Sequence, residues 1–316
     1  MEEVWLSVIV PSHNGQRWLS TALQSIADQK ERGIEVIVID SSTENTSLAI
    51  AESFSTQVVI RALRRPDLLS WMAKTNFGAE QAKGNWICML HQDDLWLPNR
   101  SAELRNWLLS QPDAVMHLHP CYIVDEVGRR LGLWRCPLPA DGSPVPAQLL
   151  YERLLVQNFI GIPTPAIRRD AYLMAGGLDK TLWYTADWDL YLKIASIGNI
   201  CYHLTPLACF RIHKNSLTVL GSRDIDDFRH QHSTVLYRHL SKIAPDSRTP
   251  VRRIAEASIE VNVALAAAAA GRFSGIRKAI QCILLLGPRG ISRYFSYSRI
   301  ADRAIPRMLA LAVGRF

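Results

Sequence analysis

Short apolar segments alternate with amphipathic ones along the first half of the chain. Four of the apolar segments are short enough and rich enough in β-branched residues to be predicted as buried strands. They are residues 6–10, 34–39, 58–63 and 85–90. Residues 18–27 and 68–82 carry apolar side chains at helical spacing. Near-continuous apolar strands separated by helices predict a parallel sheet that is covered on both faces and binds ligands at the carboxyl ends of its strands.

The second half of the chain has a more varied pattern. The breaker cluster PLPADGSPVP at residues 137–146 indicates a surface loop. Helices are expected at residues 147–156 and 188–195, and one or two strands at residues 200–212. Residues 222–316 are predicted to be mainly helical. Their run of alanines before Gly271 suits close helix packing in a small separate bundle.

Positive charge is concentrated at the C-terminal end of this 316-residue chain, whose net charge is +7. Residues 1–221 hold 20 Lys and Arg against 22 Asp and Glu, whereas residues 222–316 hold 16 against 7. Residues 276–286 and 291–312 mix arginines with Leu, Ile, Phe and Tyr, as in amphipathic helices that lie on an anionic membrane. The alternative is a helical appendage with solvated arginines. A nucleic-acid partner is not expected, because no nucleic-acid-binding module is recognisable.

Three features bear on the cellular compartment. The six cysteines show no CxxC spacing and are expected to be reduced thiols. The N-terminal segment MEEVWLSVIV is acidic and enters a strand at once, unlike a signal peptide. No apolar stretch reaches the roughly 18 to 20 residues that a membrane-spanning helix requires. We therefore expect a cytoplasmic protein, and the basic tail raises a peripheral position on the inner face of the cell membrane as a further expectation.

The most informative segment is NWICMLHQDDLW at residues 85–96, an apolar run that ends in Asp93 and Asp94. A buried strand that opens onto two carboxylates places negative charge where parallel strands form a ligand crevice. Carboxylates there can hold a divalent metal against a phosphate. The alternative is that the two carboxylates solvate a loop or cap a helix that begins near Pro98.

Two further carboxylates occupy comparable positions. Asp40 follows the second predicted strand, where a carboxylate can bind the base or ribose of a nucleoside. Asp187 lies at the expected start of a helix, where the macrodipole favours an anion that could act as a general base. For both residues the alternative is a simple helix N-cap. Asp189 is expected to be structural. The first strand–helix loop, PSHNG, lacks the GxGxxG pattern and no P-loop motif occurs, so neither a dehydrogenase nor a P-loop NTPase is expected.

Arg211 and His213 are two residues apart and would share one face of an extended segment. A neutral imidazole there could complete a metal site, and Arg211 could pair with a phosphate. The alternative for His213 is an ordinary polar residue. His117 and His119 have the same spacing but no third ligand nearby, so we expect them to be structural.

These motifs, taken in their order along the chain, resemble family 2 of the glycosyltransferases, which use nucleotide sugars and have the GT-A fold. The resemblance covers about residues 5–220. It rests on SVIVPSHNG, EVIVID, TNFGAEQAKGNWICMLHQDDLWLP, IPTPAIRRDAYLMAGGLD, ADWDLYLKIA and FRIHKNSLT. It implies an α/β fold of GT-A type, with a Rossmann-like, mostly parallel sheet and flanking helices. Residues 1–221 would form the catalytic domain, followed by a mainly helical, basic region at residues 222–316.

The resemblance also implies roles for individual residues. Asp187 would be the catalytic base, and Asp93 would be the metal ligand of the family's D-x-D motif, with Mg²⁺ or Mn²⁺ as the cofactor. His213 would join the metal or the diphosphate. Further residues would line the nucleotide-sugar site. They are Pro11, Ser12, Asn14, Asp40, Asn76, Gly78, His91, Asp94 and Arg211.

The chain departs from the family's commoner pattern at three positions. His91 replaces the first Asp of D-x-D, Ser41 replaces a second Asp after Asp40, and Ala186 stands where many members have Glu. Because His91 adds no negative charge, metal affinity would rest mainly on Asp93.

The implied reaction is an inverting transfer of a sugar to a hydroxyl group, in polysaccharide or glycolipid assembly. The donor would be a UDP-sugar in the first place, or a dTDP- or GDP-sugar, and the acceptor a carbohydrate or a lipid-linked molecule. Trp183, Tyr184 and Trp188 could stack on a sugar ring beside the base, or could serve packing alone. The alternative function is a non-catalytic GT-A domain that binds a nucleotide or a sugar, as His91 and Ser41 make conceivable.

Overall fold

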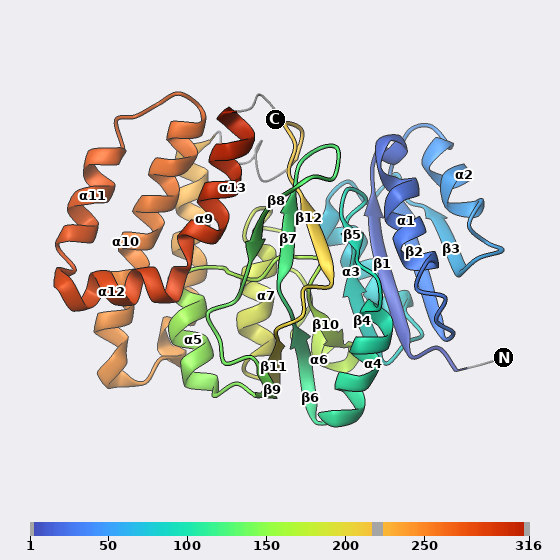
Figure 1. Ribbon diagram of the computed structural model, residues 1–316, viewed down its shortest axis with the longest axis horizontal. Coiled ribbons are helices and arrows are strands. Elements are labelled where there is room, and N and C mark those ends of the chain that lie inside the picture. Colours follow the sequence, from blue (N-terminus) through green and yellow to red (C-terminus); the bar gives the residue numbers. More distant parts are fainter. Residues whose placement is uncertain (1–2, 217–223, 313–316) are drawn as a thin grey trace.

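The computed structural model describes residues 3–216 and 224–312, and its α/β part contains two sheets (Figure 1). The large sheet has the strand order β3-β2-β1-β4-β10-β6-β11-β9. Its strands are β1 (Leu6–Ser12), β2 (Ile34–Asp40), β3 (Val59–Arg64), β4 (Trp86–Met89), β6 (Ala114–Leu118), β9 (Asp141–Pro144), β10 (Ala166–Arg168) and β11 (Asn199–His203). Strands β3, β2, β1 and β4 are parallel, as are β6 and β11, whereas β10 and β9 are antiparallel to their neighbours. The predicted, mostly parallel sheet is confirmed.

Both faces of the parallel strands are buried, which explains their near-continuous apolar sequence. In β1, Val8 and Val10 belong to one core cluster, whereas Ile9 between them belongs to the other. The helices of the α/β part are α1 (Leu19–Ala27), α2 (Thr46–Glu52), α3 (Trp71–Gln81), α4 (Arg100–Ser110), α5 (Ala147–Val156), α6 (Arg169–Met174) and α7 (Ala186–Ile194). Helix α3 packs closely on β1, because a Cβ at Gly78 would lie only 2.6 Å from Cγ2 of Ile9.

A small second sheet, which the sequence pattern did not predict, has the strand order β5-β12-β7-β8. Its strands are β5 (Leu95–Trp96), β7 (Cys121–Val124), β8 (Arg130–Trp134) and β12 (Ala208–Arg211). The segment at residues 200–212 is therefore two strands, β11 and β12, which belong to different sheets. Because β12 pairs with β5, it lies beside the loop that follows β4. This pairing brings two distant motifs of the sequence together.

The breaker cluster at residues 137–146 is not only a loop. Its residues Asp141–Pro144 form β9, which pairs with β11 at the edge of the large sheet. An edge position is compatible with the proline content of this segment, because an edge strand has one side without sheet partners. The prediction of a surface loop is therefore corrected to a short edge strand with flanking loops.

Residues 224–312 are mainly helical, as predicted, and their helices pack against the α/β part (Figure 1). They are α9 (Ile225–His239), α10 (Pro245–Ala269), α11 (Ile276–Leu284), α12 (Gly287–Ser298) and α13 (Ile300–Ala312). Helix α10 contacts α5, and α13 lies on β8, where a Cβ at Gly132 would be 2.5 Å from Cγ of Pro306. The same core cluster contains Leu154 of α5 and Ile254 of α10. The division at residue 221 stays a prediction.

None of the helices in the described ranges is long and apolar enough to cross a membrane. All six cysteines are free, as expected, and five of them are buried. The alanine-rich end of α10 buries Ala264 and Ala267, and Gly271 ends it with a positive φ of 75°. Glycine adopts this left-handed conformation without the steric cost that a Cβ brings.

Candidate active site

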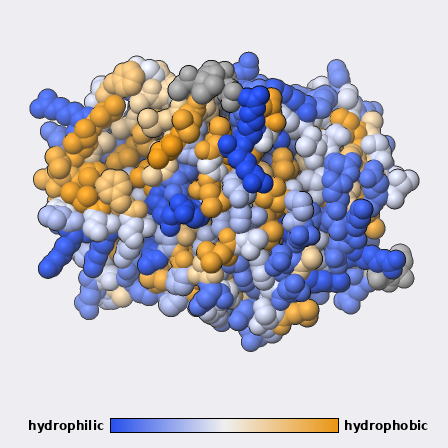
Figure 2. Space-filling model, in the orientation of Figure 1, coloured by the Kyte–Doolittle hydropathy of each residue, from blue (hydrophilic) through white to orange (hydrophobic). Residues whose placement is uncertain are grey.

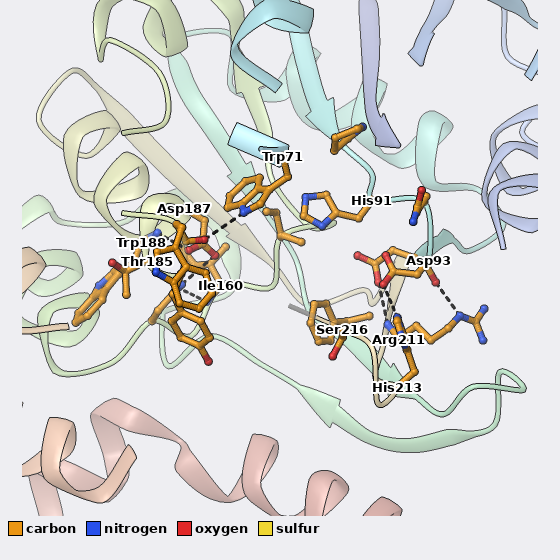
Figure 3. A pocket seen from close by; sticks show the side chains of 18 of the residues that line it. Trp71, His91, Asp93, Ile160, Thr185, Asp187, Trp188, Arg211, His213 and Ser216 are labelled. Atoms are coloured by element: carbon orange, nitrogen blue, oxygen red, sulfur yellow. Dashed lines mark hydrogen bonds and ion pairs between the residues drawn. The ribbon is translucent and has the colours of Figure 1, made fainter. Parts of the chain in front are cut away.

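A cavity of about 420 Å³ opens beyond the carboxyl ends of β1 and β4, where a ligand site was expected. Its walls come from the loops after these strands, from the end of β12, from the start of α7 and from the C-terminal helices. The predicted site residues in its walls are Pro11, Ser12, His91, Asp93, Asp94, Asp187, Arg211 and His213. Asp93 lies at one end and Asp187 at the other, with Trp71 and His91 between them (Figure 3).

Asp93 and His213 form the polar centre of one end of the cavity. Oδ2 of Asp93 lies 2.8 Å from Nε2 of His213, and because a carboxylate only accepts, the imidazole donates through Nε2. Burial acts to raise the pKa of Asp93, but the hydrogen bond from His213 and the nearby His91 outweigh it, and the pKa lies below its usual value. Asp93 is therefore an anion that still faces the cavity, with 21% of its side chain exposed.

Asp94 differs sharply from its neighbour. Its Oδ1 accepts a hydrogen bond of 2.8 Å from the backbone N–H of Arg211, and its Oδ2 is buried without a partner in the described structure. Burial and the charge of Asp93 raise the pKa of Asp94 well above its usual value. Asp94 thus joins the β4 loop to β12, whereas Asp93 carries the available negative charge.

Arg211 clamps two loops to each other. Its Nε donates to the carbonyl of Asp93 at 2.7 Å, and its Nη1 donates to the carbonyls of Asp125 and Glu126, each at 3.0 Å. The side chain is 4% exposed. The guanidinium therefore fixes the backbone around the acidic pair, and Nη2 is the part of it without a hydrogen bond to the described residues.

The residues at this end fit a divalent cation that substrate oxygens help to hold. No group of three or more His, Cys, Asp or Glu side chains that could bind a metal occurs among the described residues. Asp93 and His213 provide two ligands, and Nδ1 of His213 and Oδ2 of Asp94 are buried without hydrogen-bond partners. Mg²⁺ and Mn²⁺ commonly use one or two protein ligands together with phosphates and water.

The loop after β1 is tied to the loop after β4 by Gln92, a residue that sequence reasoning missed. Its Oε1 accepts hydrogen bonds from Oγ of Ser12 and from the backbone N–H of His13, and its Nε2 donates to the carbonyl of His13. A Cβ at Gly15 would lie 2.7 Å from the same Oε1. A larger residue at Gly15 would therefore have to displace the Gln92 side chain from these hydrogen bonds.

Lys74 is a second residue that sequence reasoning missed. It comes from α3, lines the cavity and is 3% exposed, with Nζ donating to the carbonyl of Ser12 at 2.7 Å. Burial lowers the pKa of Lys74 to about 8, against the opposing charge of Asp40. A lysine on the apolar face of a predicted helix was the signal that could have identified it.

Four of the predicted site residues lie outside the walls of the cavity. Asp40 is fully buried, and its carboxylate accepts from Oγ and N of Ser42. Asn14 has a left-handed backbone and its N–H donates to Oγ of Ser42. Asn76 binds Tyr172 and both backbone groups of Leu178. Gly78 serves helix packing, as described above. The N-cap position of the helix after Asp40 is held by Asn45, so the N-cap alternative for Asp40 is excluded.

Asp187 lies in the first turn of α7 and faces the cavity opposite Asp93 (Figure 3). Its carboxylate accepts a hydrogen bond of 2.8 Å from the N–H of Trp188 and one of 3.1 Å from Nδ2 of Asn158. Burial raises the pKa of Asp187 to about 6, although both hydrogen bonds oppose this. The residue at the N-cap of α7 is Thr185, so the simple N-cap alternative for Asp187 is wrong.

The other residues near Asp187 divide into packing and cavity residues. Asp189 is structural, as expected, because it is buried and pairs with Lys193, Arg238 and His239. Trp188 is also structural, since it is buried and its Nε1 donates to the carbonyl of Leu154. Trp183, Tyr184 and Trp188 all line the cavity. His117 and His119 are buried and outside the cavity, paired with His203 and Arg100 respectively.

The Asp187 end of the cavity also contains residues from the C-terminal helices, which sequence reasoning did not connect with the site. Asn262 of α10 and Arg303 and Arg307 of α13 line it. The guanidinium carbons of Arg303 and Arg307 lie 5.7 Å and 5.9 Å from the centre of the Trp134 ring. A basic helix that begins 82 residues after the last motif gave no indication that two of its arginines lie in the cavity.

Comparison with known proteins adds an independent finding. The family described as Glycosyl transferase family 2 matches residues 7–175. An uncharacterized glycosyltransferase of Haemophilus influenzae is 29% identical over 192 residues, which cover 60% of this chain and 61% of that protein. A protein of Escherichia coli named UDP-Glc:alpha-D-GlcNAc-diphosphoundecaprenol beta-1,3-glucosyltransferase WfgD is 27% identical over 221 residues, which cover 69% of this chain and 81% of that protein. The chain thus spans about three fifths of the length of the first relative.

Solved structures support the fold. The structure of TarS residues 1–349 of S. aureus, in complex with UDP-GlcNAc, matches with a TM-score of 0.58 at 14% identity, covering 87% of this chain and 90% of that one. The mannosyltransferase PcManGT of Pyrobaculum calidifontis, in complex with GDP-Man and Mn2+, matches with a TM-score of 0.57 at 18% identity, covering 98% of this chain and 88% of that one. These likenesses confirm the predicted GT-A fold.

Proposed function

The chain belongs to glycosyl transferase family 2, whose model matches more than half of it, and from this we propose an inverting hexosyl transfer from a nucleotide sugar to a hydroxyl acceptor. The single observation that supports it best is the placement of Asp93 and Asp187 at opposite ends of one cavity. A single-displacement reaction needs the leaving group and the base on opposite sides of the anomeric carbon. The Asp93 end suits the diphosphate, and the Asp187 end suits the attacking hydroxyl.

In the proposed reaction Asp187 acts as the general base. Its carboxylate accepts the proton of the acceptor hydroxyl while the oxygen attacks the anomeric carbon, and the bond from that carbon to the diphosphate oxygen breaks. The nucleoside diphosphate leaves with the bonding electron pair, and the anomeric configuration inverts. A base with a pKa near 6 is ionised at neutral pH and is more basic than an ordinary aspartate.

We propose that the cofactor is Mg²⁺ or Mn²⁺, held by Asp93 together with His213. When bound, such a cation would neutralise negative charge on the leaving diphosphate. Lys74 and His91 stand in the same part of the cavity, where Lys74 adds positive charge and His91 can donate to an oxygen. The second structural neighbour was solved with GDP-Man and Mn2+, which supports this assignment.

The donor and the acceptor class follow from the relatives. We propose a UDP-sugar as the first choice of donor, because the Escherichia coli relative is named for UDP-Glc and the TarS structure contains UDP-GlcNAc, with GDP- and dTDP-sugars as the other members of the class. The acceptor proposed is a carbohydrate or a lipid-linked sugar, in polysaccharide or glycolipid assembly. The name of the same Escherichia coli relative contains a diphosphoundecaprenol acceptor.

A donor-hydrolysis panel tests the proposal. UDP-, dTDP- and GDP-sugars are incubated with the protein in the presence of Mg²⁺, Mn²⁺ or EDTA, and released nucleotide is measured. We expect one donor class to be turned over, EDTA to stop the reaction, and Asp93→Ala to reduce it to about 1% or less. The control Asp113→Ala removes an exposed carboxylate far from the cavity and should have no effect.

The alternative, a non-catalytic nucleotide- or sugar-binding domain, predicts a different result in the same panel. No donor would be turned over, even with candidate acceptors added, although calorimetry would still detect nucleotide binding. The raised pKa of Asp187 favours the enzyme, because a binding domain has no need for a partly buried carboxyl whose ionised form is disfavoured.

We also propose that the C-terminal helices contact the surface of an anionic membrane, on the cytoplasmic side. Ile276, Ile280 and Leu284 follow one another at intervals of four residues on α11 and are 38%, 55% and 64% exposed. Apolar side chains gather over this end of the molecule in Figure 2. An exposed apolar helix face of this kind, with nearby arginines, is typical of peripheral membrane binding.

Pelleting with liposomes that contain phosphatidylglycerol tests this contact. The full chain should pellet with them, and replacing Ile280 and Leu284 with Ser should reduce the pelleted fraction about tenfold, because two large apolar side chains no longer enter the bilayer. The matched control replaces Leu109 and Val127, which are 78% and 70% exposed on other parts of the molecule. Equal pelleting of all three proteins would refute the membrane contact.

A further inference from the structure

Two arginines of α13 stand in the cavity without a carboxylate partner. Within the described structure, Arg303 and Arg307 form no ion pair, and Nε and Nη2 of Arg303 are buried with no hydrogen-bond partner. The neighbouring Asp302 pairs instead with Arg135 and Arg299. Residues 217–223, outside the described ranges, read LTVLGSR and contain no carboxylate side chain either.

A guanidinium with buried, unpartnered nitrogens destabilises the folded protein when no ligand is bound. Burial lowers the pKa of Arg303 to about 10, and the positive charge of Arg307 acts in the same direction. Buried polar groups without partners cost free energy unless a ligand supplies the missing interactions. The aromatic ring of Trp134 faces both guanidiniums but offers only a weak interaction to a cation. A bound anion would supply what the described residues do not.

The position of the pair relative to Asp187 identifies which substrate would carry the anion. Tyr184 connects the arginine pair with Asp187. Burial raises the pKa of the Tyr184 phenol, and the charges of Arg307, Arg303 and Asp187 also act on it. The charges around Asp93 are instead those of His91 and His213, and those around Asp94 include Arg211. The arginines therefore share Tyr184 as a neighbour with the proposed base, and no such link to Asp93 occurs among the described residues.

We propose that Arg303 and Arg307 bind a phosphate or diphosphate group of the acceptor and thereby hold the acceptor hydroxyl beside Asp187. Two adjacent guanidiniums match the oxygens of a phosphate or diphosphate, to which arginine forms paired, charge-assisted hydrogen bonds. Trp183 and Tyr184 line the same cavity and provide aromatic surface for the acceptor sugar. This inference rests on the proposed function, since it specifies the acceptor of the same reaction.

Binding of decyl diphosphate to the full chain, measured by calorimetry in the presence of saturating UDP, tests the anion site directly. UDP occupies the nucleotide end, so the remaining binding reports on the arginine end. We expect the double variant Arg303→Gln/Arg307→Gln to weaken decyl diphosphate binding about 100-fold, because each charge-assisted interaction contributes about tenfold or more. Inorganic pyrophosphate should show the same loss.

The matched control is Arg289→Gln/Arg293→Gln, which removes two exposed arginines of α12 that do not line this cavity. It should bind decyl diphosphate as the unchanged protein does. The lysine pair Arg303→Lys/Arg307→Lys should retain part of the affinity. Circular dichroism and UDP binding show whether each variant is folded. Equal binding by all variants, or competition between decyl diphosphate and UDP, would overturn the proposal.

Two further measurements separate this site from others. Vesicles of phosphatidylglycerol should bind the double variant as well as the unchanged protein, and a loss there would mean that the arginines serve a lipid headgroup instead. The UDP affinity of the double variant, measured by calorimetry, should stay within about threefold of that of the unchanged protein, since a loss of UDP affinity would assign the pair to the donor. If the unchanged protein hydrolyses no donor, the proposed function fails, while the decyl diphosphate measurement still decides the anion site.

Discussion

The two ends of the cavity differ in the chemistry of the polar atoms that they leave unpartnered. At the Asp93 end these atoms belong to carboxylate and imidazole groups, such as Oδ2 of Asp94 and Nδ1 of His213. At the α13 end they include the N–H donors Nε and Nη2 of Arg303 and Nε1 of Trp134, together with the hydroxyl of Thr185. The first set suits a cation and the second an anion. One end of the cavity therefore suits a positively charged ligand and the other end a negatively charged one. Asp187 lies beside the end that we propose to bind the anion.

The ends also differ in how they are built. The Asp93 end is assembled by the β4 loop and β12, and Arg211 and Gln92 fix its backbone through several hydrogen bonds. The α13 end is completed by helices that pack on β8 and α5. If the Asp93 end binds the donor and the α13 end the acceptor, as we propose, acceptor preference can change through the helices without disturbing the donor chemistry.

The largest effect is expected at Asp187, which we propose as the base between the two ends. Asp187→Asn keeps the size of the side chain and the hydrogen bond that it accepts from the N–H of Trp188. The amide, however, cannot take up the proton of the acceptor hydroxyl. We expect transfer to fall about 100- to 10,000-fold, the usual contribution of a general base. UDP affinity, measured by calorimetry, should change less than about threefold. Transfer retained within tenfold by the variant would refute the assignment.

The pH dependence of transfer is the next largest effect. Because burial raises the pKa of Asp187 to about 6, the carboxylate is lost on acidification well before an ordinary aspartate would be protonated. We expect the rate at saturating acceptor to fall about tenfold per pH unit below 6 and to level off above pH 7. Donor binding over the same range serves as the control, and an acid limb centred near pH 4 would contradict a buried base.

The difference between the ends also shows what the sequence could and could not predict. Asp93, His213 and Asp187, which the sequence singled out, all line one cavity, because Asp93 follows β4, His213 follows β12 and Asp187 lies in the first turn of α7; their roles stay predictions. Lys74, Gln92, Arg303 and Arg307 were missed. Their roles depend on which helix face packs against the sheet and on where α13 packs on the α/β part. A local pattern of residues predicts neither.

Asn76 marks the limit of inference from motifs, since it was predicted for the donor site and lies outside the cavity. It accepts from the hydroxyl of Tyr172 at 2.6 Å and from the N–H of Leu178 at 2.9 Å, and it donates to the carbonyl of Leu178. We expect Asn76→Ala to lower the free energy of unfolding by about 2 to 4 kcal/mol, because buried groups lose their partners. Urea denaturation measures this.

Two further measurements decide what Asn76 does. UDP affinity should stay within about threefold of the unchanged protein, and Asn106→Ala, at an exposed position of α4, should leave the stability unaltered. A variant of Asn76 with normal stability and lost UDP binding would instead favour the role in the donor site that the family resemblance implies.

The smallest expected effect is a change in the free energy of unfolding, and it also concerns Asp187. Burial raises the pKa of Asp187 above its value of 3.8, so the folded state disfavours the ionised form. The resulting loss of stability is absent below pH 3.8, grows between pH 3.8 and about 6, and is complete above it. Asp187→Asn, which is neutral at every pH, should therefore raise the free energy of unfolding at pH 8 by about 1 kcal/mol, after allowance for partial solvent contact. Thermal melts should show about 2 °C of stabilisation at pH 8 and none at pH 4. Stabilisation of equal size at both values would mean that Asp187 is not ionised against an opposing environment, and the argument for a tuned base would fail with it.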